Sequence, residues 1–180
     1  IDASGNNIQS CATDIVGILY QNASGTVRGN WVKNQSPAPG YTGCQTGLAI
    51  YVETGGLGTA SVTITGNQVQ NFAKNGITGD DMGANLTVTG NKVLGSGPTT
   101  GAAENAVQIA FGATGTITGN TVGDAIWAPD QFGDTGDAAA GLLVYDSPGV
   151  MIKSNIVAST QYGIAVVSDG NGSADSATVM

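Results

Sequence analysis

The side chains best suited to bind a ligand lie in one segment, 123–140, where carboxylates and aromatic rings follow one another closely. Aromatic rings stack on the apolar faces of sugars, and carboxylates accept hydrogen bonds from sugar hydroxyls. Two further segments, expected beside this one, supply an acid and a ring. We therefore predict a saccharide-binding loop face, with Asp124 nearby, formed by Tyr41, Glu104, Trp127, Asp130, Phe132, Asp134 and Asp137. An ordinary loop in which Trp127 is the hydrophobic anchor is the simpler interpretation.

The acids of the same segment also suit a calcium ion. Asp130, Asp134 and Asp137 are closely spaced, and calcium takes oxygen ligands from flexible loops. Their order does not match the Asp-x-Asp-x-Asp loop of an EF-hand. Calcium is therefore a candidate ligand here, and no other cofactor is expected. Asp80 and Asp81 form a second acidic pair, which we expect in a solvated bend.

A repeated phrase, Gly-Asn-x-aliphatic, shows which elements must position these segments. It occurs six times at intervals of 24 to 37 residues, once with Ser in place of Gly. An alternating Thr-rich strand precedes most copies, as at 62–65 and 86–89, and another short strand follows, as at 76–78 and 163–166. Repeats of this length with period-2 alternation predict a solenoid with three strands in each turn.

The asparagines have a structural role in such a solenoid. Stacked carboxamides at one bend can bond to one another and to buried backbone that the sheets leave unpaired. We expect this ladder to contain Asn6, Asn30, Asn67, Asn91, Asn120 and Asn155.

The pattern resembles the right-handed parallel β-helix proteins of the pectate-lyase-like superfold, and the resemblance covers essentially all 180 residues. It implies an all-β fold, a three-sheet parallel β-helix of about six coils with an internal Asn ladder. We expect residues 1–180 to form a single domain that is part of a longer β-helix. The superfold contains lyases, hydrolases, epimerases, tailspikes and adhesins, so the resemblance is specific for fold and not for activity.

Catalytic residues of the enzymes that the fold resembles usually project from the outer face of one sheet. The outward positions expected here are uncharged: Leu19, Ala49, Thr78, Gln108, Leu143 and Ala165. None of them can exchange a proton near neutral pH, and the chain has no histidine and one arginine. The sequence thus predicts no catalytic residue. The alternative is a fragment of a polysaccharide lyase or epimerase whose catalytic groups lie partly outside these positions.

The two cysteines, Cys11 and Cys44, fall in equivalent bends of the first and second turns. Stacking of the turns would bring them together, so we predict a disulfide and a secreted, periplasmic or cell-surface location. Two unrelated buried thiols are the alternative.

The outward Thr rows and the two ends of the sequence are compatible with structural roles. The outward Thr rows, which include Thr26, Thr63, Thr87 and Thr116, resemble the ice-binding face of some β-solenoid antifreeze proteins, but Arg28 and Lys153 interrupt them. Both ends of the sequence have the same phase of the repeat and no polar cap. A fragment of a longer β-helix or end-to-end self-association of copies would each explain this.

The charge restricts the partners. A net charge of −8 with five basic residues leaves little surface to neutralise phosphates, so nucleic-acid binding is not expected. The longest apolar stretch, 138–145, is too short for membrane insertion. The function predicted from the sequence is a non-catalytic secreted scaffold that binds polysaccharide or cell-surface glycan through inserted loops. A structural or self-assembling surface protein is the third alternative.

Overall fold

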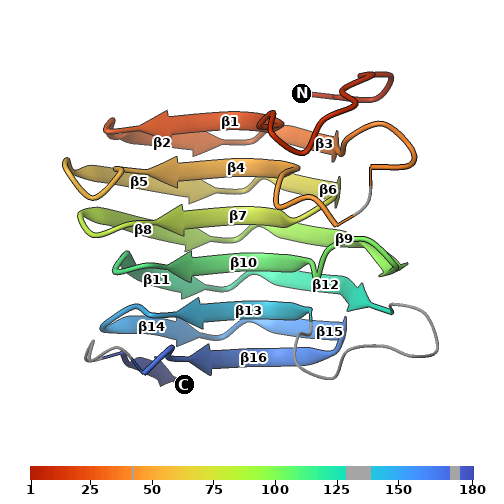
Figure 1. The fold of residues 1–180 in the computed structure, drawn as a ribbon. Coiled ribbons are helices and arrows are strands. Elements are labelled where there is room, and N and C mark those ends of the chain that lie inside the picture. The colour runs from red at the N-terminus through yellow and green to blue at the C-terminus, as the bar shows by residue number, and fades with distance from the viewer. Residues whose placement is uncertain (42, 129–138, 171–174) are drawn as a thin grey trace.

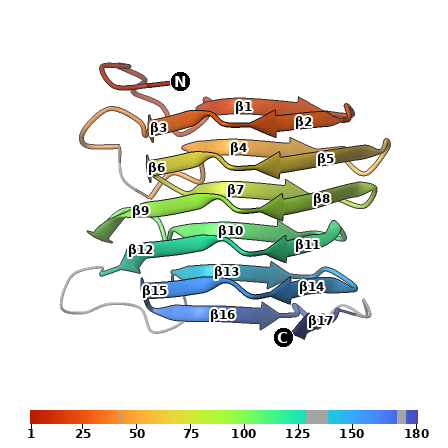
Figure 2. The ribbon, with the colours of Figure 1, turned by 180° about the vertical axis from the view of Figure 1, so that it is seen from behind.

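The structure is a computed structural model that describes residues 1–41, 43–128, 139–170 and 175–180. Within these ranges every regular element is a β-strand, and the strands form three parallel sheets. Each complete coil of the chain supplies one strand to each sheet, and the coils stack from the N-terminal end to the C-terminal end (Figures 1 and 2). The three-sheet parallel β-helix predicted from the repeat is therefore confirmed.

The chain passes through the three sheets in a fixed order. The first sheet contains β1 (Val16–Gln21), β4 (Leu48–Glu53), β7 (Asn75–Asp80), β10 (Asn105–Ala110), β13 (Ala140–Tyr145) and β16 (Tyr162–Val167). The second sheet contains β2 (Gly25–Arg28), β5 (Ala60–Thr65), β8 (Ala84–Thr89), β11 (Thr114–Thr118), β14 (Val150–Lys153) and β17 (Ala177–Val179). The third sheet contains β3 (Trp31–Gln35), β6 (Gln68–Phe72), β9 (Lys92–Thr99), β12 (Thr121–Trp127) and β15 (Ile156–Thr160).

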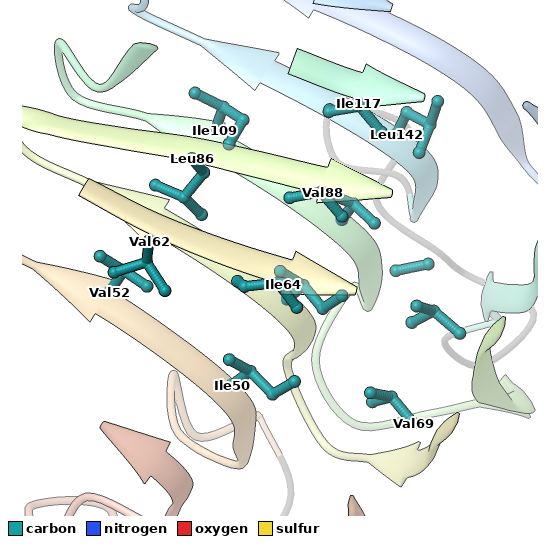
Figure 3. Close-up of a cluster of buried hydrophobic side chains, with 14 of the residues drawn as sticks. Ile50, Val52, Val62, Ile64, Val69, Leu86, Val88, Ile109, Ile117 and Leu142 are labelled. Atoms are coloured by element: carbon teal, nitrogen blue, oxygen red, sulfur yellow. The ribbon is translucent and has the colours of Figure 1, made fainter. Parts of the chain in front are cut away.

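The core is a column of aliphatic side chains enclosed by the three sheets. Alternate residues of β5 point inward, so Val62 and Ile64 are buried while Thr63 and Thr65 face outward. In-register pairing then places Leu86 beside Val62, and Figure 3 shows these side chains packed between the strands. Burying each such side chain contributes about 1.5–3 kcal/mol, which makes this column the main source of stability. The predicted Thr rows are also in register, with Thr26, Thr63, Thr87 and Thr116 on neighbouring strands.

The asparagine ladder runs along the bend between the second and third sheets. Each rung but the last donates from its backbone N and its Nδ2 to the Oδ1 of the next rung; between Asn67 and Asn91 these distances are 2.9 and 3.0 Å. The rungs are Asn30, Asn67, Asn91, Asn120 and Asn155. Gly66 and Gly90, which precede two of them, have φ of 63°, a conformation that glycine adopts without steric cost.

Asn6 is not a rung of this ladder, so the predicted ladder was one residue too long. Its Nδ2 donates instead to the carbonyl oxygens of Ala3 and Ser36, and its backbone N donates to Ala3. The segment before it pairs with the rest of the molecule through one isolated bridge, Asp2 to Lys33. Since no strand of the second sheet precedes Asn6, the bend that positions the other asparagines does not form there.

The predicted disulfide between Cys11 and Cys44 is present, with the two Cα atoms 5.0 Å apart. It joins the segment before β1 to the segment before β4, so it ties the first coil to the second. No helix in the described part of the chain is long and apolar enough to cross a membrane.

Candidate functional site

The inserted segments extend from one edge of the first sheet. The connections from β3 to β4, from β9 to β10 and from β12 to β13 all precede strands of this sheet, and they are longer than the two residues that join β6 to β7. Because parallel strands begin at the same edge, the described parts of these connections lie on one side of the sheet, at the right of Figure 1. Their described residues form a wall along one side of the sheet's outer face.

A groove of about 760 Å³ lies over the outer face of β4, β7, β10 and β13. Its floor is made by outward side chains of these strands, and its wall includes residues 101–103 and Trp127 from the inserted segments. The floor includes the side chains of Tyr51, Glu53, Asn75, Asp80, Asn105, Gln108 and Tyr145. The groove thus combines amide, carboxyl and aromatic groups over four adjacent strands.

Two carboxyl groups lie side by side on this floor. Val52 pairs with Gly79, which places the following residues, Glu53 and Asp80, next to each other on β4 and β7. Burial raises the pKa of Asp80 to about 6, against the opposing effect of a hydrogen bond with Gln108, and the Asp81 charge adds to the increase. Asp80 is therefore a group that changes its charge just below neutral pH.

The hydroxyl of Tyr51 interacts with both carboxyl groups. Burial and the nearby charges of Asp80 and Glu53 raise the pKa of Tyr51 far above its ordinary value, so the phenol stays protonated and can act as a donor. The second acid of the pair seen in the sequence, Asp81, lies in the bend with φ of 77°. Its Oδ2 accepts hydrogen bonds from the backbone N of Thr54 and Gly55. Asp81 thus holds the turn, whereas Asp80 belongs to the groove.

An amide network fixes the orientation of Gln108. Its Oε1 accepts hydrogen bonds from the Nδ2 of Asn75 and of Asn105, each at 3.1 Å. With the oxygen engaged in this way, the Gln108 amide nitrogen is the atom available to donate to Asp80. The network therefore fixes the orientation of these floor side chains in the absence of a ligand.

Aromatic rings stand at two places around the floor. Phe111 and Tyr145 meet edge to face, with ring centroids 5.5 Å apart, at the carboxyl ends of the strands. At the opposite edge, Trp127 donates from Nε1 to the carbonyl oxygen of Gly101 at 2.8 Å. This bond connects two inserted segments and holds the indole ring against the wall of the groove.

A second, smaller cavity of about 170 Å³ adjoins the groove and shares Gly43, Gly101 and Ala102 with it. It is lined by Tyr41 and by Glu104, which is only 1% exposed. The Glu104 Oε2 accepts a hydrogen bond from the backbone N of Ser96 at 2.9 Å. Burial nevertheless dominates and raises the pKa of Glu104 to about 7.

The buried Glu104 carboxyl predicts a pH dependence of stability. Its pKa is about 7 in the folded protein against an ordinary 4.5, so the folded state binds more protons between these values and loses stability as the pH rises through them. We expect Glu104→Gln, which resembles the protonated acid, to remove about 2 kcal/mol of this loss. Urea unfolding of both proteins at pH values from about 4.5 to 8 measures it. Parallel pH profiles of the two proteins would contradict the assignment.

The residues predicted to form one loop face lie in different places in the structure. Tyr41 and Glu104 line the smaller cavity, and Trp127 lines the groove. Asp130, Phe132, Asp134 and Asp137 lie outside the described residues, so the calcium site proposed at the three aspartates stays a prediction. Among the described residues no group of three or more His, Cys, Asp or Glu side chains could hold a metal ion.

The floor of the groove was missed because one strand was aligned incorrectly. Ala49 was expected on the outer face, but it is fully buried, and the residue in register with Leu19 and Thr78 is Tyr51. Glu53 and Asp80 each end a strand; Asp80 was missed because it was expected in a solvated bend, and no role was predicted for Glu53. The expectation that this face has no ionisable residue was therefore wrong. Aligning Leu48-Ala49-Ile50 with Val16-Gly17-Ile18 would have found Tyr51.

The fold and the groove define a class of protein, the parallel β-helix with a polar and aromatic groove on the outer face of one sheet. The chain belongs to the family described as "Periplasmic copper-binding protein (NosD)", whose model matches residues 1–174. This is a parallel β-helix family, in agreement with the resemblance that the repeats indicated. The comparison with curated proteins gave no match, and the comparison with solved structures gave none either.

Proposed function

We propose that the protein binds polysaccharide in the groove on the outer face of the first sheet. The observation that carries this proposal is the combination of a preset amide and carboxyl floor with aromatic rings on two sides. Ring faces bind the apolar faces of sugars, while amides and carboxyls bind the hydroxyls. Four strands at a spacing of about 4.8 Å make a floor about 14 Å wide, which suits several linked sugar units better than one.

The binding test compares the two tryptophans of the chain. Trp127 lines the groove, whereas Trp31 is on β3 of the third sheet, is 52% exposed and packs against Lys33. We expect Trp127→Ala to weaken retention on a bound polysaccharide at least tenfold, about 1.4 kcal/mol, because it removes a stacking surface. Affinity electrophoresis in gels that contain soluble polysaccharides measures this.

Trp31→Ala is the matched control and is expected to bind as the wild type does. Trp127→Phe keeps a ring but loses the hydrogen bond to Gly101, so an intermediate affinity is expected. Equal losses for Trp127→Ala and Trp31→Ala, or no retention of the wild type on any polysaccharide, would contradict the proposal.

A location outside the cytoplasm supports a role in glycan binding. The family is described as periplasmic, and the disulfide between Cys11 and Cys44 is compatible with a periplasmic or secreted protein. Polysaccharides of the cell envelope or its surroundings are the ligands available there.

The description of the family names copper binding, but this chain has few side chains that copper prefers as ligands. Copper prefers imidazole, thiolate and thioether ligands. The chain has no histidine, and both cysteines are in the disulfide. Of the three methionines, Met82 follows β7, while Met151 is on β14 and Met180 follows β17. The donor set therefore does not fit a copper centre, and we assign no role to the metal.

A carbohydrate-active enzyme is the second candidate, and the pKa of Asp80 favours it. A carboxyl with a pKa of about 6 beside a second carboxyl in a sugar-binding groove can give or take a proton in a reaction at a glycosidic bond. Unsaturated or reducing-end products from a polysaccharide that the protein binds would support this candidate. Binding without products would leave the scaffold function alone.

A further inference from the structure

The lining of the groove is acidic. Among its described residues Asp14, Glu53 and Asp80 carry carboxyl groups, and Lys74 is the one cation. The Lys74 Nζ donates to the carbonyl oxygen of Ala103 at 3.1 Å, which directs its charge toward the wall. The whole chain carries a net charge of −8. A ligand in the groove therefore meets a negative potential, which attracts cations and repels anions.

The negative charge is concentrated at one point of the floor. Glu53 and Asp80 follow the paired residues Val52 and Gly79 on adjacent strands, and such strands lie about 4.8 Å apart. Glu53 also accepts a hydrogen bond at 2.8 Å from the Nε2 of Gln21, on the neighbouring strand β1. Both carboxyls line the groove, so one positive group can lie within reach of the two.

Asp80 lacks part of the compensation that a carboxylate needs. Gln108 and Tyr51 interact with this carboxyl group, but its Oδ1 is buried and has no hydrogen-bond partner among the described residues. An ionised carboxyl with an unpaired, poorly solvated oxygen is destabilised. A cation in the groove would stabilise the ionised form of Asp80 through its charge, whereas an anionic ligand would add repulsion.

The groove therefore discriminates between classes of polysaccharide. Resting on the function proposed above, we infer that it selects polymers of amino sugars that carry free ammonium groups, with one ammonium at Glu53 and Asp80, and that it rejects polyuronates. Trp127 and the Phe111–Tyr145 pair also line the groove and are available to neighbouring sugar rings. An ammonium group supplies three donors, enough for both carboxyl groups.

The test uses oligosaccharides of one backbone that differ in charge. β-1,4-linked glucosamine oligomers, fully N-acetylated or fully deacetylated, are titrated into the protein by calorimetry at a pH near the Asp80 pKa of about 6, with an oligogalacturonate of equal length beside them. We expect the deacetylated oligomer to bind at least tenfold more tightly than the acetylated one and to weaken with added salt. We expect no binding of the oligogalacturonate, with or without calcium.

Charge-neutral variants assign this preference to the floor. In the double variant Glu53→Gln with Asp80→Asn, the ratio of the two affinities is expected to fall to near one. Asp124→Asn removes an acid of β12 that does not line the groove, and it is expected to keep the wild-type ratio. A preference that survives the double variant, or binding of the oligogalacturonate, would overturn the inference.

The outcomes also separate this inference from the function on which it rests. Equal affinity for acetylated and deacetylated oligomers would refute charge selection and leave polysaccharide binding in place. No binding of any saccharide, in this assay and in the gel assay, would refute both.

Discussion

Asn91→Ala is expected to lower the free energy of unfolding by about 4 kcal/mol. The Asn91 Nδ2 donates to the carbonyl oxygens of Ile64 and Thr89 and to the Oδ1 of Asn120. Its Oδ1 accepts from the backbone N and the Nδ2 of Asn67. Alanine removes these bonds at a site only 2% exposed, so the Asn67 backbone N and the Ile64 carbonyl lose partners without gaining water.

Asn6→Ala provides the matched control for this measurement. It is the same substitution in the same repeated phrase, but Asn6 is outside the ladder and has partners only near the N-terminal end. We expect a loss below about 1 kcal/mol. Urea unfolding followed by circular dichroism compares the two variants, and similar losses would show that the ladder is not a main stabilising element.

Removal of the disulfide by the double substitution Cys11→Ser with Cys44→Ser is expected to lower the free energy of unfolding by about 3 kcal/mol. The bond closes a loop between residues 33 positions apart, so its loss increases the entropy of the unfolded chain. It also frees the second-coil insertion, which contributes to the wall of the groove. We therefore expect weaker saccharide binding in the same variant.

Reductant provides an independent check of the disulfide prediction. Wild-type protein should lose the same stability in dithiothreitol, whereas the double serine variant should be insensitive to it. A wild type that is equally stable with and without reductant would contradict the assigned contribution.

The fold could be predicted because its determinants repeat along the chain. Each Gly-Asn phrase specifies a bend through the backbone freedom of glycine and the hydrogen-bonding capacity of asparagine. Alternating aliphatic residues specify the inner face of each strand. The prediction failed for Asn6, where the repeated phrase lacks the preceding strand.

The groove could not be predicted to the same extent because it depends on the register between coils. The expected outward position of the second coil, Ala49, was two residues too early, because Gly47, which has φ of 92°, lies in the connection that precedes β4. The resulting shift placed Ala49 where Tyr51 lies. A single residue of misalignment exchanges the two faces of a strand, and a shift of two replaces one outward side chain by another.

Asp80 shows a second limit of the sequence. Two successive aspartates are typical of a turn, and Asp81 does hold one. The chemistry of Asp80 depends instead on contacts with Tyr51 and Gln108 from neighbouring coils. No local pattern in the sequence indicates those contacts.

Whether the groove is the saccharide-binding surface is tested by the fluorescence of a single tryptophan during saccharide titration. Trp31→Phe leaves Trp127, in the groove wall, as the only tryptophan, and Trp127→Phe leaves only Trp31. We expect a saturable change in emission from the Trp127 protein when the deacetylated oligomer is added, and no change from the Trp31 protein. A change that follows Trp31, or saturable binding that leaves the Trp127 emission unchanged, would contradict the groove as the functional surface.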